Sequence, residues 1–278
     1  MLPHTRLGKT DLQISRLGLG TVKFGRNQGV KFPEAFELPS DQQARELLNL
    51  ARDLGINLLD TAPAYGASEE RLGSLLRGER KEWIICSKAG ESFDGVESHF
   101  DFSPAALRKS LDKSLRQLRT DYVDILLIHS DGNDLDIIHR DQVLHSLAQF
   151  KREGWIRAFG MSTKTVAGGM LCAQEADVIM TTYDPESEDD RHLLDQCAAQ
   201  HTGVLLKKIF NSGHLLAQSS TEQPQNRPQK KAKTPVKTIE EKLELIFSHK
   251  AVNSAIIGTL NCQHLRDNVA CALDVLIA

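Results

Sequence analysis

The sequence contains no apolar run of about 18 residues, and its first residues lack the apolar segment of a signal peptide. We therefore expect neither a membrane-spanning nor a secreted protein and predict a cytoplasmic one. The five cysteines form no C-x-x-C pair, so their spacing indicates neither a disulfide framework nor a zinc site. The ten histidines form no H-x-x-H or H-E-x-x-H cluster, so we predict no metal.

An excess of charge of one sign is also missing. The 34 Lys and Arg residues against 37 Asp and Glu residues give a formal net charge of −3, which gives no reason to expect a nucleic-acid surface. With 40% hydrophobic residues, the composition is typical of a globular protein. The oligomeric state stays open. A length of 278 residues suits either one large α/β barrel or two ordinary domains.

Short apolar segments alternate along the chain with segments of helical periodicity. The predicted strands cover residues 17–20, 56–60, 83–87, 123–128, 155–160, 177–181, 203–207 and 254–258. The predicted helices cover residues 41–54, 68–77, 104–118, 140–153, 164–175, 188–200, 238–248 and 262–276. This alternation predicts parallel strands joined by right-handed helical crossovers.

Eight such units close a (β/α)8 TIM barrel. An open doubly wound sheet usually has about five or six strands and a G-x-G-x-x-G turn, and that motif does not occur in this sequence. A turn-rich centre between two short alternating segments predicts a β-hairpin over residues 5–17. We therefore predict one α/β domain over residues 1–278, a TIM barrel with an N-terminal β-hairpin.

The predicted loop over residues 89–103 is unusually long for a compact domain. It carries four aromatic or imidazole side chains, Phe93, His99, Phe100 and Phe102. Long loops that carry such residues often cover binding sites, so we favour a lid that faces the substrate over a segment without fixed structure.

A second long segment, residues 211–237, carries four cations beside proline, glutamine and serine: Arg227, Lys230, Lys231 and Lys233. Two interpretations remain open. The cations either clamp the phosphates of a bound dinucleotide through charge-assisted contacts or stay solvated on a flexible segment.

Three successive predicted strands end in an ionisable residue: Asp60, Lys88 and His129, with Tyr65 just beyond the first. Taken alone, Asp60 and Tyr65 fit a structural interpretation as well as a functional one. In the structural interpretation, Asp60 caps a turn and Tyr65 is a half-buried aromatic. In a barrel, however, side chains at the carboxyl ends of the strands face a common pocket. The repetition therefore favours an active site.

The residue types indicate the chemistry. A free tyrosine has a pKa of about 10, and we expect a Lys88 ammonium beside the phenol of Tyr65 to lower it. Asp60 is the expected partner of the lysine. We expect a neutral His129 to orient a carbonyl oxygen toward Tyr65. These four residues together can protonate a carbonyl oxygen as hydride arrives from a cofactor. In the reverse direction they remove the proton of the hydroxyl.

These motifs resemble those of the aldo-keto reductases, bacterial-type with a short C-terminus, over essentially the whole chain. The matching segments are Arg6-Leu7-Gly8, Leu17-Gly18-Leu19-Gly20-Thr21, Asp60-Thr61-Ala62, Tyr65-Gly66, Lys88, Ile128-His129, Gly154-Trp155-Ile156-Arg157, Gly160-Met161-Ser162, Ile256-Ile257-Gly258-Thr259, His264-Leu265 and Asn268. The resemblance implies an NAD(P)H-dependent oxidoreductase that interconverts a carbonyl (aldehyde, ketone or sugar) and an alcohol. It also implies a catalytic tetrad of Asp60, Tyr65, Lys88 and His129, with Tyr65 as the general acid.

The resemblance implies a nicotinamide cofactor held by Thr21, Ser162, Thr163, Lys207, Lys208, Ser212, Gly258, Thr259, His264, Asp267 and Asn268. Thr163 stands where the family usually has asparagine, Met180 where it has glutamine, and Lys207 where an aromatic commonly stacks. Gly258 and His264 stand where several branches bind the 2′-phosphate with lysine and arginine. The resemblance favours NADP as the cofactor, and because these two residues differ, NAD is possible as well.

The residues after His129, Ser130-Asp131-Gly132-Asn133, replace a frequent aromatic and proline, and a long C-terminal loop is missing. The substrate class therefore stays open. The altered positions 163, 180 and 207 motivate an alternative function, a nucleotide-binding regulatory or interaction protein with little turnover, as in the potassium-channel β-subunit branch of the family. The complete tetrad favours the enzyme.

Overall fold

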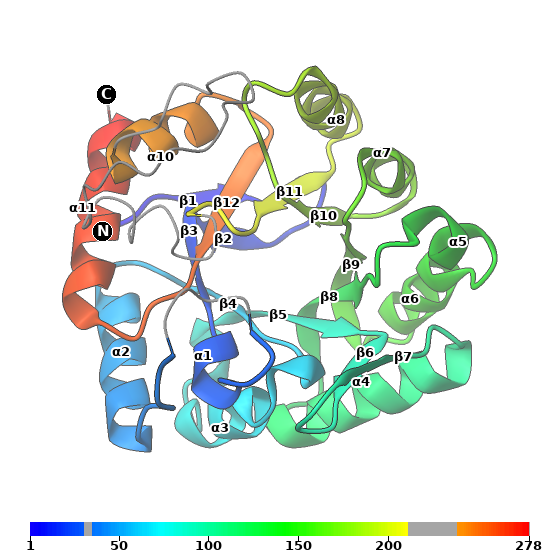
Figure 1. Cartoon of the computed structure of the whole chain (residues 1–278), viewed down its shortest axis with the longest axis horizontal. Coiled ribbons are helices and arrows are strands. Elements are labelled where there is room, and N and C mark those ends of the chain that lie inside the picture. Colours follow the sequence, from blue (N-terminus) through cyan, green and yellow to red (C-terminus); the bar gives the residue numbers. More distant parts are fainter. Residues whose placement is uncertain (31–34, 211–237, 278) are drawn as a thin grey trace, which may run out of the picture.

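The structure, a computed structural model, describes residues 1–30, 35–210 and 238–277 (Figure 1). Eight parallel strands close into a barrel: β3 (Leu17–Gly20), β4 (Leu58–Asp60), β5 (Ile84–Ala89), β8 (Val123–His129), β9 (Ile156–Ser162), β10 (Val178–Thr181), β11 (Gly203–Leu206) and β12 (Val252–Ile257). They neighbour each other in chain order, and β12 pairs with β3 to complete the ring. The predicted barrel is confirmed, and the predicted strand ends differ by no more than two residues.

Helices surround the barrel (Figure 1). The longer ones are α2 (Asp41–Asp53), α3 (Ser68–Leu75), α4 (Pro104–Leu118), α6 (Val143–Arg152), α7 (Val166–Glu175), α8 (Glu188–Ala199), α10 (Ile239–Phe247) and α11 (Cys262–Ile277). Short turns are α1 (Val22–Gly25), α5 (Asp134–His139), η1 (Pro63–Tyr65) and η2 (Arg80–Glu82). None of the helices in the described ranges is long and apolar enough to cross a membrane.

Local sequence signals set several helix starts. Ser40 and Gln43 form a capping box at α2, and Ser103 caps α4, which begins with a proline. The helix predicted over residues 140–153 is confirmed as α6, but its predicted start is three residues too early. Gln142 adopts a left-handed conformation with φ of 49°, which an α-helix interior does not accept, so α6 begins only at Val143.

The predicted N-terminal hairpin is confirmed as β1 (His4–Arg6) paired with β2 (Gln13–Ser15). Its apolar residues, including Leu7 and Ile14, are fully buried in the same cluster as the side chains that fill the barrel. Gly8, with φ of +50°, lies so close to β11 that a Cβ would come within 2.3 Å of the Gly203 nitrogen. The hairpin therefore seals one end of the barrel.

Residues 89–103 do not form an irregular loop. They contain the antiparallel pair β6 (Glu91–Phe93) and β7 (Ser98–Phe100). Phe102 is only 7% exposed and packs in the core against Gly90. That the segment forms a lid facing the substrate stays a prediction. Arg26 lies over the Phe93 ring at 3.5 Å and donates to the Ala64 carbonyl at 2.9 Å, which ties the β6–β7 hairpin to the segment after α1.

Candidate active site

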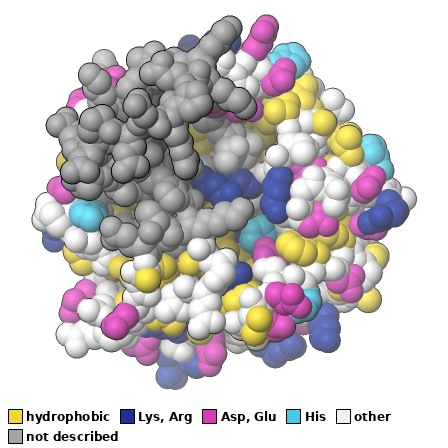
Figure 2. All heavy atoms as spheres, in the orientation of Figure 1, with side chains coloured by type: hydrophobic (Ala, Val, Ile, Leu, Met, Phe, Trp, Pro, Cys, Tyr) yellow, Lys and Arg dark blue, Asp and Glu magenta, His cyan; other side chains and the backbone are white. Residues whose placement is uncertain are grey.

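A cavity of about 680 Å³ opens among the carboxyl ends of the barrel strands, and Asp60, Tyr65, Lys88 and His129 all line it. Figure 2 shows Lys and Arg side chains gathered in the central hollow of the face it displays. The structure therefore brings the four sequence-predicted catalytic residues together from β4, η1, β5 and β8.

Tyr65 is held by a short 3-10 turn, η1, that begins with Pro63. Gly66 follows with φ of +61°, and a Cβ at this position would lie 2.2 Å from the carbonyl oxygen of Gly25. Only glycine suits both the conformation and the close approach. The Tyr65-Gly66 pair therefore folds the phenol back over the end of β4.

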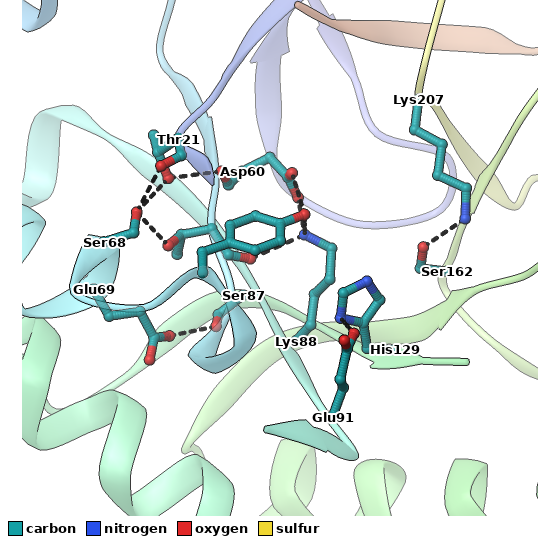
Figure 3. Close-up of polar contacts among 12 residues, drawn as sticks. Thr21, Asp60, Ser68, Glu69, Ser87, Lys88, Glu91, His129, Ser162 and Lys207 are labelled. Atoms are coloured by element: carbon teal, nitrogen blue, oxygen red, sulfur yellow. Dashed lines mark hydrogen bonds and ion pairs between the residues drawn. The ribbon is translucent and has the colours of Figure 1, made fainter. Parts of the chain in front are cut away.

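Lys88 is the centre of the polar network (Figure 3). Its Nζ donates to Asp60 Oδ1 at 2.5 Å, to the Thr61 carbonyl at 2.9 Å and to Tyr65 Oη at 3.1 Å. Burial by itself lowers the pKa of Lys88, but Asp60, Tyr65 and Cys86 together outweigh this effect, so the pKa is raised and the ammonium persists.

The pKa of Tyr65 differs from the sequence-based expectation. Burial, followed by the Asp60 charge, raises the pKa of Tyr65 to about 12, although Lys88 opposes this shift. The predicted lowering is wrong because Lys88 is already paired with Asp60, so the cation only partly offsets desolvation of a phenolate. The phenol is consequently protonated at neutral pH, the form that donates a proton.

His129 has a partner that the sequence analysis missed. Its Nδ1 lies 2.6 Å from Oε2 of Glu91, and the two side chains are 20% and 12% exposed. Burial alone would raise the pKa of Glu91, because it disfavours the ionised carboxylate. Contacts with His129, Ser98 and Arg26 outweigh this effect and lower the pKa to about 2. Burial lowers the pKa of His129, despite the opposing carboxylate. An acid three residues after Lys88 is the only sequence signal for this contact.

Most of the expected cofactor residues line the same cavity: Ser162, Thr163, Lys207, Lys208, Gly258, Thr259, His264 and Asn268. Met180 lines it as well. Lys207 donates from Nζ to Ser162 Oγ and to the Thr163 carbonyl, each at 2.8 Å. Burial, reinforced by Lys208, lowers the pKa of Lys207 to about 7. The buried Thr163 hydroxyl has no hydrogen-bond partner among the described residues.

Two expected cofactor residues lie elsewhere. Thr21 is fully buried, donates to the Asp60 carbonyl at 2.9 Å and shares a hydrogen bond with Ser68 at 2.8 Å. Asp267 is exposed and accepts from Gln263 at 2.7 Å. Ser212 and the segment 211–237, with its four cations, lie outside the described residues.

Three cations that sequence analysis did not single out also line the cavity: Lys23, Arg26 and Lys164. They come from α1, from the segment after it and from the loop after β9. The cavity's two carboxylates, Asp60 and Glu91, already contact Lys88 and His129. The lining therefore has an excess of positive charge, which suits a ligand that carries phosphate or another anion.

Comparisons with known proteins agree with this geometry. Residues 16–276 match the Aldo/keto reductase family. A crystal structure of an aldo-keto reductase of Pseudomonas aeruginosa superimposes with a TM-score of 0.83 at 46% identity, covering 98% of this chain and 96% of that chain. The oxidoreductase YqkF of Bacillus subtilis is 27% identical over 96% of this chain and 90% of its own length. L-galactose dehydrogenase of Arabidopsis thaliana is 28% identical over 97% and 88%.

Proposed function

The chain belongs to the aldo/keto reductase family and is an oxidoreductase, and from this premise we propose that it interconverts an aldehyde, ketone or sugar and the corresponding alcohol with NADP(H), using Tyr65 as the proton donor. The observation that carries the proposal is the single ammonium of Lys88, which is bonded to both Asp60 and Tyr65 at the edge of a cavity. A buried lysine in this position stabilises the negative charge left on a phenol that gives up its proton.

In the direction of reduction, the Tyr65 hydroxyl transfers its proton to the carbonyl oxygen, and Lys88 stabilises the resulting phenolate from 3.1 Å. Asp60 keeps Lys88 charged and directed at the phenol. The nicotinamide, when bound, supplies hydride to the carbonyl carbon or accepts it from the alcohol. The raised pKa of Tyr65 suits the acid role, because the proton is present at neutral pH.

The lining fits a nicotinamide dinucleotide. Lys207 and Lys208 offer cations for phosphate groups, and the unpartnered Thr163 hydroxyl offers a hydrogen bond to a carboxamide. His264 and Asn268 reach the cavity from α11. The excess of cations favours the phosphorylated cofactor, NADP, over NAD.

The name of the Arabidopsis relative, L-galactose dehydrogenase, supports including sugars among the candidate substrates. A polyhydroxylated substrate would meet several polar groups on the cavity wall, including Ser98, Ser162 and Thr182.

The proposal is tested by mixing the NADPH-loaded protein with a panel of aldehydes, ketones and aldoses and following nicotinamide absorbance. We expect cofactor oxidation with at least one class, and cofactor reduction when NADP⁺ is mixed with the matching alcohol. Tight cofactor binding without turnover on any member of the panel would overturn the proposal in favour of a nucleotide-binding regulatory protein. The three positions that depart from the family pattern, Thr163, Met180 and Lys207, favour that second function, and all three line the cavity.

A further inference from the structure

We propose that the amine of Lys207 is a nucleophile that captures small aldehydes as an imine in the cofactor-free protein. The site is the part of the cavity wall formed by Lys207, Ser162 and Thr163. Formation of the imine requires no hydride transfer and no proton from Tyr65, so this activity is separate from the proposed oxidoreductase function.

The hydrogen bonds of the amine leave one position free. Lys207 follows β11, is half-buried and lines the cavity. Its Nζ donates to Ser162 Oγ and to the Thr163 carbonyl, each at 2.8 Å, and Figure 3 shows the first of these bonds. An ammonium carries three N–H groups, and no third acceptor contacts it among the described residues. A neutral amine uses both of its N–H groups here and keeps one lone pair for a ligand.

Lys207 differs from Lys88 in having no counter-charge. Lys88 Nζ lies 2.5 Å from Asp60 Oδ1, so its ammonium is paired. The other carboxylate of the cavity, that of Glu91, lies 2.6 Å from His129. No carboxylate of the described residues forms an ion pair with Lys207. A partly buried ammonium without a paired carboxylate is unfavourable, and the neutral amine is correspondingly favoured.

The charge of Lys207 is set by burial and by groups from several elements. Burial lowers its pKa to about 7, and neighbouring cations reinforce this shift. The charged and titratable groups that act on it are Lys208 after β11, Lys88 on β5, Lys164 after β9, His129 on β8 and Asp134 on α5. The three lysines disfavour the ammonium and Asp134 favours it, whereas His129 is neutral because its own pKa is lowered. A large part of the Lys207 amine is therefore free at neutral pH.

The capture step needs no oxidant or reductant. The lone pair of Nζ attacks the aldehyde carbon, a C–N bond forms, and the carbonyl π bond opens to give a carbinolamine. The two hydrogens of the amine pass to the oxygen, which leaves as water, and a carbon–nitrogen double bond remains. Addition of water reverses the step. The cavity of about 680 Å³ has room for a small aldehyde beside the amine, and a lysine desolvated next to other cations is the kind that forms imines.

The test traps the imine in cofactor-free wild-type protein. Butyraldehyde is added near pH 7 together with cyanoborohydride, which supplies hydride to an imine and fixes it as a butylamine. Intact mass measures the extent of labelling, and peptide mapping locates it. We expect Lys207 to be labelled about tenfold faster or more than Lys81, an exposed lysine in η2. The reason is that an ordinary lysine, with a pKa of about 10.4, has less than about 10⁻³ of its amine free near pH 7.

The pH dependence separates a free amine from an amine that is only accessible. Because the Lys207 amine is largely free above its pKa of about 7, its labelling rate relative to Lys81 should fall as the pH rises from about 7 to about 10. The ratio of the two rates cancels the pH dependence of the reagents. Lys207→Met removes the nucleophile, and Lys207→Arg keeps a cation that does not deprotonate. Both variants should lose this adduct, and the matched control Lys81→Met should keep it.

Labelling of Lys207 no faster than that of Lys81 in the wild type would overturn the inference, and this measurement needs no variant to fold. A rate ratio that stays constant between those pH values would overturn it too, because Lys207 would then titrate as an ordinary lysine. So would labelling that is undiminished in Lys207→Met. Because trapping requires neither cofactor nor turnover, an inactive protein with a labelled Lys207 would contradict the proposed oxidoreductase function alone.

Discussion

Lys88 Nζ and Asp60 Oδ1 lie 2.5 Å apart, and their side chains are only 1% and 7% exposed. Breaking a buried ion pair leaves the remaining charge without compensation, which is far more costly than losing an exposed pair. This ion pair therefore has two separable consequences. It contributes to the stability of the fold, and it holds Lys88 where the ammonium contacts the phenol of Tyr65.

Asp60→Asn should destabilise the fold by roughly 3 to 5 kcal/mol, because the Lys88 ammonium loses its counter-charge in the barrel. The double variant Asp60→Asn/Lys88→Met should recover much of this loss but remain inactive. Urea unfolding of the three proteins measures the cycle. Asp41→Asn removes the exposed partner of Arg71 and should cost about 1 kcal/mol or less. A double variant no more stable than Asp60→Asn would contradict the expectation.

Tyr65→Phe should reduce kcat by about 10² or more and leave cofactor affinity nearly unchanged, because only the proton donor is lost. Steady-state kinetics and fluorescence titration with NADPH measure the two effects. Tyr122→Phe is the matched control, since Tyr122 precedes β8 at the opposite end of the barrel. Full turnover in Tyr65→Phe would remove Tyr65 from the mechanism.

Glu69 on α3 is fully buried and accepts hydrogen bonds from Ser87 on β5 at 2.6 Å and from Ser114 on α4 at 3.1 Å. Burial raises its pKa from 4.5 to about 7, although the two hydroxyls oppose the shift. The folded state therefore binds more protons than the unfolded state between these values, and stability falls as pH rises from 4.5 through about 7.

Glu69→Gln should accordingly be more stable than the wild type by on the order of 1 to 3 kcal/mol near pH 8, since it removes an ionisation that the fold disfavours. The difference should vanish below pH 4.5, where the wild-type carboxyl is neutral in both states. Urea unfolding at the two pH values measures it. Greater stability of the wild type near pH 8 would mean that the ionised carboxylate is favoured in the core.

Lys207 should take up a proton when NADPH binds near pH 8. Burial, with Lys208, lowers its pKa to about 7, so much of the amine is neutral there, and a nearby phosphate raises the pKa. Calorimetry in buffers of different ionisation enthalpy measures the uptake. Lys207→Met should abolish it and weaken binding, whereas Lys81→Met, an exposed change in η2, should do neither. Binding without proton uptake in the wild type would place the phosphates away from Lys207.

The sequence by itself determined the barrel and the proximity of Asp60, Lys88 and His129 at one end of it. Apolar strands alternating with helical segments admit few topologies, and the carboxyl ends of parallel barrel strands share one rim, so residues at strand ends must meet. Tyr65 follows from the same logic, because only a short turn separates it from β4.

Only the tertiary structure decided which other groups join them. Glu91 reaches His129 because Ala89 of β5 lies opposite Ile128 of β8, and the register between these two strands is set only when the sheet forms. The pKa of Tyr65 was likewise mispredicted, because desolvation depends on how deeply the folded chain buries the phenol. Residue types and spacing indicate which groups can interact. The pKa shifts of those groups depend on burial and on distances between charges, which are set only once the chain has folded.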